Sequence, residues 1–143
     1  MILRACNETD AKALAKLEKE CFSTPWNESM LLSAFSRIDF VCFVLEEAGN
    51  VIGYVCGTTL FETAELARIA VAKSWRRKGL GEKLLDAFIS CVQDRGAQQI
   101  FLEVRESNAP AIALYEKRGF EQGRVRAKYY ENGENGLEMK KLL

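Results

Sequence analysis

The sequence predicts one α/β domain over residues 1–143, built on a mixed sheet with helices on both of its faces. Two observations predict this class. Short runs of β-branched and aromatic residues alternate with longer segments whose apolar residues recur at helical spacing. Several strands are entered only after a helix, which favours a mixed sheet over a purely antiparallel one. The expected order of elements is β-α-α-β-β-β-α-β-α-β-β.

In the first half of the chain, Asn7 and Asn27 mark helix starts because an asparagine side chain can cap the first free N–H groups. Pro25 separates these two helices, since proline has no N–H to continue a helix. Ala48-Gly49-Asn50 predicts the turn of a hairpin. The elements expected here are a strand at 1–5, helices after Asn7 and after Asn27, and strands at 40–45, 51–60 and 62–72.

In the second half, Gly96 is a typical C-terminal cap for a helix that begins near Gly79. Asn108 can cap the next helix, and Pro110 is tolerated in its first turn. The elements expected here are a loop at 73–78, a helix at 79–94, a strand at 99–104, a helix that stops at Arg118-Gly119, and strands at 120–129 and 137–142.

The charge balance excludes some functions. Twenty basic and twenty acidic residues give a net charge of zero and a pI of about 6.4, which argues against a dedicated nucleic-acid-binding module. No apolar run approaches the roughly 20 residues that span a bilayer, and no signal peptide is evident. We therefore expect a monomeric cytoplasmic protein that binds neither nucleic acid nor membrane.

Histidine is absent, so Ser-His-Asp and Cys-His nucleophiles and histidine-ligated metals are excluded. Proton transfer would then depend on Glu, Asp, Tyr, Lys, Cys or water, and we expect no metal. The five cysteines are odd in number and lack the close spacing of a metal or redox pair. We expect all five to be reduced and to pack as small apolar residues.

The segment most typical of a binding site is Arg76-Arg77-Lys78-Gly79-Leu80-Gly81, followed by Glu82. It lies between an apolar strand and an amphipathic helix, where free backbone N–H groups and the helix dipole attract anions. Glycines let the backbone approach a bulky anion closely. The segment predicts a phosphate-binding turn, with a solvated charged turn as the alternative. A nucleotide P-loop is excluded because the Gly-Lys-Ser/Thr ending is missing.

A second segment, Asn108 to Phe120, has the pattern N-x-x-A-x-x-L-Y-x-x-x-G-F. With the glycine-containing turn, which fits [Gln/Arg]-x-x-Gly-x-[Gly/Ala], it resembles the GCN5-related N-acetyltransferases. These enzymes move an acetyl group from acetyl-coenzyme A to an amine. The resemblance covers essentially the whole chain. It implies a sheet splayed at its centre, with the coenzyme between the strands at 62–72 and 99–104.

The resemblance also implies where the coenzyme binds. Backbone N–H groups from Arg77 to Glu82 would hold its pyrophosphate. The strand edge at Ile69-Ala70-Val71, which is otherwise ordinary core strand, would pair with the pantetheine arm and polarise the thioester carbonyl. Asn108 would contact the coenzyme, a role compatible with capping a helix.

Glu103 is a charged residue in an otherwise apolar strand, which is costly if buried and unremarkable if it points outward. A peptide α-amine, with a pKa of about 7.7–8.0, must lose a proton before it attacks, and a partly desolvated glutamate can take it. Tyr115 either packs on the apolar face of its helix or protonates the leaving thiolate, whose thiol has a pKa of about 8.5. The resemblance assigns Glu103 the role of base and Tyr115 that of acid.

Within the family, Cys21 to Trp26, Leu102 to Arg105 and Tyr129-Tyr130 resemble the bacterial ribosomal-protein-alanine N-acetyltransferases. This implies that the substrate is the N-terminal alanine of a small-subunit ribosomal protein. Trp26, Tyr129 and Tyr130 would line the peptide groove, with simple packing as the alternative. Glu131 and Glu134 could attract a basic peptide or be ordinary surface charges.

Two other functions remain open from the sequence alone. One is the same chemistry on a lysine side chain or a small-molecule amine. The other is a non-catalytic module that binds coenzyme A.

Overall fold

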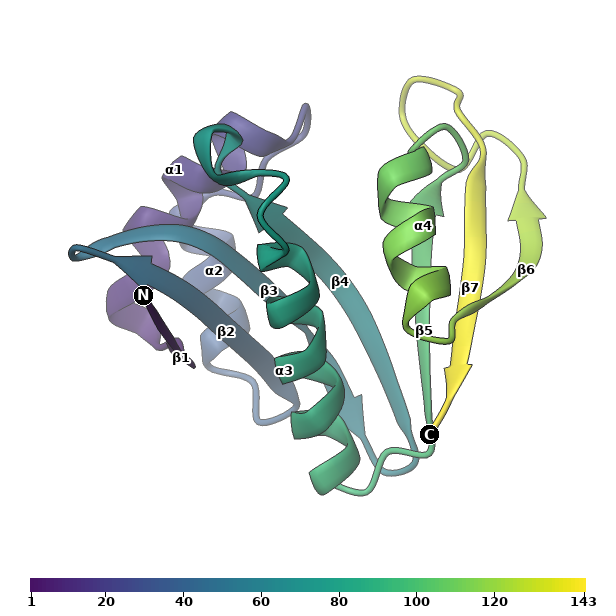
Figure 1. Ribbon diagram of the computed structural model, residues 1–143, viewed down its shortest axis with the longest axis horizontal. Helices are drawn as coiled ribbons and strands as arrows, with labels where there is room; N and C mark the ends of the chain where they lie inside the picture. The colour runs from purple at the N-terminus through teal and green to yellow at the C-terminus, as the bar shows by residue number, and fades with distance from the viewer.

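The computed structural model describes residues 1–143 and contains seven strands in one open sheet (Figure 1). The strands are β1 (Ile2–Ala5), β2 (Phe40–Glu47), β3 (Asn50–Leu60), β4 (Thr63–Val71), β5 (Gln99–Arg105), β6 (Glu121–Arg126) and β7 (Gly136–Leu142). They lie in the order β1-β2-β3-β4-β5-β7-β6. Neighbouring strands are antiparallel except β4 and β5, which are parallel. The predicted mixed α/β fold is therefore confirmed.

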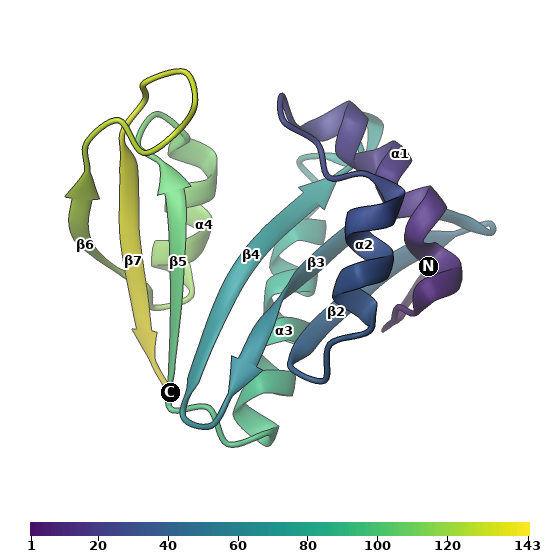
Figure 2. The same ribbon diagram turned by 180° about the vertical axis from the view of Figure 1, so that it is seen from behind.

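Four α-helices cover both faces of the sheet, as predicted. They are α1 (Ala11–Cys21), α2 (Glu28–Phe35), α3 (Leu80–Asp94) and α4 (Ala109–Lys117), accompanied by short 3-10 helices at Glu8–Asp10 and Lys73–Trp75. Figure 1 shows α3 and α4 in front of the sheet, and Figure 2 shows α1 and α2 on the opposite face. In Figure 2 the exposed face of β5, β7 and β6 has no helix over it.

The asparagine caps form as expected. Asn7 Oδ1 accepts a hydrogen bond from Thr9 N at 2.9 Å, although the first turn here is a 3-10 helix that leads into α1. Asn27 Oδ1 accepts from Met30 N at 2.8 Å. Asn108 Oδ1 accepts from Ala111 N at 3.3 Å and so begins α4. These bonds satisfy N–H groups that a helix cannot pair internally.

The core consists of two layers. On one side, the apolar stripe of α3, including Leu84, Leu85 and Phe88, packs against the sheet, and Tyr115 of α4 joins the same cluster. On the other side, α1 and α2 pack against β2, β3 and β4 through residues such as Leu14 and Leu31. Each layer follows from the alternation of strand side chains, because successive residues point to opposite faces. No helix is long and apolar enough to cross a membrane.

The sheet opens between β4 and β5. These strands pair only at Thr63↔Gln99, Ala64↔Ile100 and Glu65↔Phe101, and then diverge. Immediately beyond the last pair, Cys56 of β3 faces Arg68 and Gly57 faces Leu66, so Ala67 is an extra residue in β4. Such a β-bulge bends its strand and strengthens the local twist. The central splay that the family resemblance implied is present.

Gly57 permits this close approach of β3 and β4. A Cβ atom at this position would overlap the carbonyl oxygen of Glu65 and lie 2.8 Å from Cζ of Phe88. We expect Gly57→Ala to lower the free energy of unfolding by about 1–3 kcal/mol, the usual cost of overpacking a core. Urea unfolding measures the change. Gly81→Ala is the control, because its Cβ meets only Leu114 Cδ2 at 3.5 Å; an equal loss there would contradict the steric explanation.

The predicted strand at 120–129 is too long. β6 ends at Arg126, Lys128 has a positive φ of 53°, and Tyr129 and Tyr130 lie in the loop before β7. Asn135 Oδ1 accepts a hydrogen bond from Lys128 N at 3.1 Å and holds this loop conformation. The aromatic pair suggested a strand from its β propensity, but the left-handed backbone at Lys128 turns the chain before it reaches the pair.

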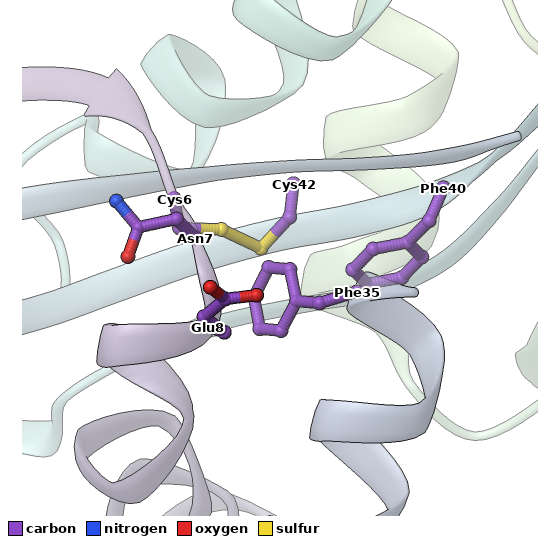
Figure 3. Close-up of a pocket in the computed structure, with 6 residues that line it drawn as sticks. All are labelled: Cys6, Asn7, Glu8, Phe35, Phe40 and Cys42. Carbon is purple, nitrogen blue, oxygen red and sulfur yellow. A yellow bond between two sulfur atoms is a disulfide. The ribbon is translucent and has the colours of Figure 1, made fainter. Parts of the chain in front are cut away.

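The expectation that all five cysteines are reduced is wrong for two of them. Cys6 and Cys42 form a disulfide, whose yellow S–S bond is visible in Figure 3. Cys6 directly follows β1, and its N–H donates to the Cys42 carbonyl at 3.0 Å, so the two residues are cross-strand neighbours with Cα atoms 5.6 Å apart. The spacing of 36 residues gave no local signal of this pairing. Cys21, Cys56 and Cys91 are free.

Candidate active site

A cleft of about 840 Å³ opens where β4 and β5 diverge. Its walls come from segments that are far apart in the sequence: β4, β5, α4, the loop between α1 and α2, and the loop between β6 and β7. The cleft brings together eight residues that the sequence singled out, namely Trp26, Ile69, Glu103, Asn108, Tyr115, Tyr129, Tyr130 and Glu131.

The remaining predicted residues lie outside this lining. Ala70 and Val71 continue β4 beyond Ile69, and all three pair with β3 on one side while β5 has turned away on the other. The turn from Arg76 to Glu82 begins α3 next to α4, since a Cβ atom at Gly81 would lie 3.5 Å from Leu114 Cδ2. Leu114 itself lines the cleft, so the turn adjoins it.

The turn has the backbone geometry of an anion site. Gly79 has a φ of 75° and Arg77 a φ of 64°, a conformation that glycine adopts without strain. None of the six backbone N–H groups from Arg77 to Glu82 donates to an acceptor of the chain. The last three belong to the first turn of α3, a helix of 15 residues whose dipole adds partial positive charge at this end. The turn can therefore bind a phosphate group through its backbone.

Two of the three cations of the turn have partners within the protein. Arg76 Nε donates to the Val71 carbonyl at 2.9 Å and ties the turn to the end of β4. Lys78 Nζ lies 5.6 Å from the centre of the Trp75 ring. Arg76 therefore fixes the turn beside the end of β4.

Glu103 is a partly buried carboxylate in the cleft, with 16% of its side chain exposed. Oε1 lies 3.4 Å from an Arg126 nitrogen, whereas Oε2 is buried and has no hydrogen-bond partner. Burial raises the pKa of Glu103, and the cation of Arg126 opposes that rise. A carboxylate that lines a cleft and has a raised pKa is suited to accept a proton.

Tyr115 lies on α4 and packs against Phe120, with ring centres 5.7 Å apart. Burial raises the pKa of its hydroxyl to about 12, so the group keeps its proton at neutral pH. Tyr115 and the β5 residues Leu102 and Val104 belong to one core cluster, and Glu103 alternates with these strand residues. Glu103 and Tyr115 therefore approach the cleft from opposite faces of the sheet.

The loop between α1 and α2 is held by a buried polar network. Glu18 is fully buried, and its Oε1 accepts a hydrogen bond from Trp26 N at 2.8 Å. Its carboxylate also pairs with Arg68 at 3.3 Å and accepts from the Tyr54 hydroxyl. The Arg68 guanidinium in turn stacks on Trp26, 4.5 Å from the ring centre, and on Phe22 at 4.1 Å.

Sequence reasoning missed this network. Glu18 stands on the apolar stripe of α1, at helical spacing from Ala11 and Leu14, and a charge at such a position signals a buried partner. Its partners Tyr54 and Arg68 lie on β3 and β4, so only the fold brings them together. Trp26 is partly buried and also lines the cleft, so packing and lining a peptide groove, the two roles expected for it, are compatible.

The opposite wall carries the aromatic pair. Tyr129 and Tyr130 stack edge to face at 5.0 Å, and the Arg105 guanidinium lies 4.1 Å from the centre of the Tyr130 ring. Arg105 also pairs with Glu131 at 3.2 Å and with Glu134 at 3.4 Å. Both acidic residues therefore have an internal cation, which argues against the expectation that they attract a basic peptide.

A hydrogen bond joins the loop between α1 and α2 to the loop between β6 and β7. Thr24 Oγ1, from the loop after α1, donates to Glu131 Oε1 at 2.8 Å. This bond spans 107 positions of sequence and joins the loop at Trp26 to the loop at Tyr130. The cleft is therefore bounded by β4 and β5 at its base and by two linked loops. No group of three or more Cys, Asp or Glu side chains is arranged to hold a metal ion.

Known proteins resemble this chain over most of its length. A model of the acetyltransferase (GNAT) family matches residues 11–120. The [ribosomal protein bS18]-alanine N-acetyltransferase of Escherichia coli (strain K12) is 35% identical over 122 residues, which cover 85% of this chain and 82% of that protein. An N-alpha-acetyltransferase of Sulfurisphaera tokodaii is 29% identical over 150 residues, which cover 96% and 90% of the two chains.

A solved structure agrees with these sequence relationships. The crystal structure of the ribosomal-protein-S18-alanine N-acetyltransferase from Escherichia coli has a TM-score of 0.91 to this chain at 32% identity. The match covers 99% of this chain and 92% of that one. The similarity therefore includes both loops and both strands that bound the cleft.

Proposed function

Because this chain belongs to the acetyltransferase (GNAT) family and is an acyltransferase, we propose that it acetylates the N-terminal α-amine of a protein. We further propose that the donor is acetyl-coenzyme A and that the acceptor is the N-terminal alanine of a small-subunit ribosomal protein. The observation that carries this proposal is the gap between β4 and β5, which opens a cleft lined by Ile69, Glu103 and Tyr115 and adjoined by the turn before α3.

The residues present fit the cosubstrate. The free N–H groups from Arg77 to Glu82 would hold its pyrophosphate, and the open edge of β4 at Ile69-Ala70-Val71 would bind its pantetheine arm. Asn108, which begins α4 in the cleft, would also contact it. Acetyl-coenzyme A supplies an acetyl thioester, whose carbonyl carbon is the site of amine attack.

Glu103 and Tyr115 would move the two protons of the reaction. The Glu103 carboxylate accepts a proton from the α-amine, directly or through water, as the amine nitrogen bonds to the carbonyl carbon. The carbon–sulfur bond breaks, and the Tyr115 hydroxyl donates a proton to the leaving thiolate. A backbone N–H of the β4 edge stabilises the negative charge that grows on the carbonyl oxygen. The amine attacks directly, so no acetyl-enzyme forms.

An α-amine is the favoured acceptor for two reasons. The relatives named above are an alanine N-acetyltransferase and an N-alpha-acetyltransferase. The Thr24–Glu131 bond also links the two loops over the cleft, which favours entry of the narrow end of an extended peptide. Aromatic side chains of Trp26, Tyr129 and Tyr130 would line its path. A lysine acceptor and a non-catalytic role are the alternatives that the assay below distinguishes.

Acetyl transfer to two synthetic peptides, read by mass, tests the proposal. The first peptide begins with alanine followed by basic residues, and the second has the same sequence with additional lysines and a blocked N-terminus. We expect one acetyl group on the first peptide, located at its N-terminus by the resistance of the product to Edman degradation, and none on the second.

The other outcomes have distinct meanings. Acetylation of the blocked peptide would replace the proposal with side-chain chemistry. Absence of transfer to both peptides, with coenzyme A still bound in a calorimeter, would contradict turnover on a free tail. The intact ribosomal protein would then be tried as substrate, and failure there would overturn the proposed function.

A further inference from the structure

We propose that Arg126 is a positioning residue that pairs with one oxygen of Glu103 and thereby sets the pH range of catalysis. This inference rests on the proposed function, because it assumes that Glu103 is the base. It goes further by assigning a task to charges of β6 and β7 that neither the motifs nor the family match single out.

The two carboxylate oxygens of Glu103 have different surroundings. Oε1 lies 3.4 Å from an Arg126 nitrogen, while Oε2 is buried without a partner. A buried, unpaired carboxylate oxygen is costly in a folded protein, and it is retained here at the cleft. A fully covered oxygen cannot take a proton directly from a molecule in the cleft, so Oε1 is the oxygen on the path of the proton. Arg126 lies beside that oxygen and therefore acts on the proton-accepting atom itself.

The surroundings of Glu103 include charges of both signs. Glu138 of β7 is its direct cross-strand partner and lies 3.5 Å from Arg124. The titratable and charged groups that face Glu103 are Arg124 and Arg126 from β6, Glu138 from β7, Glu65 from β4, Tyr130 from the following loop and Arg105 from its own strand. Acidic and basic neighbours thus act on one carboxylate in opposite directions.

The signs of these effects can be assigned. Burial raises the pKa of Glu103, the positive charge of Arg126 lowers it, and the negative charge of Glu138 raises it. Removing Arg126 should therefore keep Glu103 protonated up to a higher pH. Removing the charge of Glu138 should let Glu103 ionise at a lower pH. Arg124 has the sign of Arg126 and a weaker influence.

Arg126 also contacts the peptide side of the cleft. Its guanidinium lies 5.1 Å from the centre of the Tyr129 ring, within the range of a cation–π contact. Arg126 therefore touches both Glu103 and an aromatic residue proposed to line the peptide groove. This second contact predicts that replacing Arg126 also raises KM, an effect separable from a shift in pH dependence.

The test compares Arg126→Gln with Glu138→Gln in two measurements. The first is the titration of the Glu103 carboxyl by NMR with ¹³C-labelled glutamate, which needs no turnover. The second is the pH profile of kcat/KM for the alanine peptide. We expect the Glu103 titration and the acidic limb of the profile to move to higher pH in Arg126→Gln and to lower pH in Glu138→Gln. The substrate amine also titrates, but it does so identically for every variant, so it does not contribute to the difference between their acidic limbs.

Two further variants serve as controls. Arg124→Gln removes a cation from the same strand and should shift the limb in the same direction by less. Arg126→Lys keeps the charge and should return the limb toward its wild-type position. A merely structural role of Arg126 would change the amount of active protein and leave both titrations in place.

The outcomes separate the two proposals. Unshifted titrations in both Gln variants, with Glu103→Gln inactive, would overturn the role of Arg126 and leave the base assignment intact. Full turnover in Glu103→Gln would overturn the base assignment, and the inference would fail with it. Shifts of the same sign in Arg126→Gln and Glu138→Gln would contradict an electrostatic mechanism.

Discussion

Glu103→Gln is expected to lower kcat for the alanine peptide by about 10²–10⁴-fold, the usual contribution of a general base. Glutamine retains the shape of the side chain but cannot accept the amine proton. Burial raises the pKa of Glu103, so in the wild-type enzyme activity should fall as the pH drops and this carboxylate becomes protonated. The variant should lose that part of the acidic limb. Steady-state rates across pH give both results.

Coenzyme binding is the control for this variant. Glu103 lies on β5, away from the turn at the start of α3, so the Kd for coenzyme A should change little. Tyr115→Phe is the matched comparison, because it should also lower kcat but leave the acidic limb where it is. An unchanged pH–rate profile in Glu103→Gln would show that another group, or solvent alone, removes the proton.

Gly81→Glu is expected to weaken coenzyme A binding by roughly 10³-fold. Gly81 belongs to the run of free N–H groups, and a carboxylate there would lie close to a bound pyrophosphate. Two like charges about 4 Å apart near a protein surface repel by about 4 kcal/mol, and each 1.4 kcal/mol is about a factor of ten in Kd. Isothermal titration calorimetry with coenzyme A measures the loss.

Gly81→Ala distinguishes charge from bulk at this position. Its Cβ would meet Leu114 Cδ2 at an ordinary contact distance of 3.5 Å, so we expect binding close to wild type. If both variants bound coenzyme A like the wild type, the turn would not be the pyrophosphate site. If both lost binding equally, steric crowding rather than charge would be the cause.

The order of elements could be predicted because it depends on local chemistry. Apolar residues at helical spacing, asparagine caps at Asn7, Asn27 and Asn108, and the turn at Gly49 are all readable from neighbouring residues. Parts of the candidate site could be predicted for the same reason, since the turn before Gly81 and the segment around Tyr115 are short continuous sequence patterns. Their convergence on one cleft required the family resemblance, because strand order does not follow from periodicity.

Features formed by residues distant in the sequence could not be predicted in this way. The Cys6–Cys42 disulfide depends on β1 pairing with β2, and the Glu18–Arg68 pair depends on α1 packing over β4. Neither contact lies within a short window of sequence. The end of β6 before Tyr129 is different, because Lys128 N and its acceptor Asn135 Oδ1 are only seven positions apart.

The opening between β4 and β5 also affects how the protein meets other copies of itself. Where these strands separate, each has an edge of backbone groups not paired with the other. Unpaired strand edges normally invite another chain to extend the sheet, which leads to aggregation. Here both edges lie inside a cleft bounded by α4 and by two loops linked through Thr24 and Glu131. Another sheet would have to enter between α4 and these loops before it could pair with either edge. The elements that enclose the cleft therefore also cover two strand edges at the centre of the sheet.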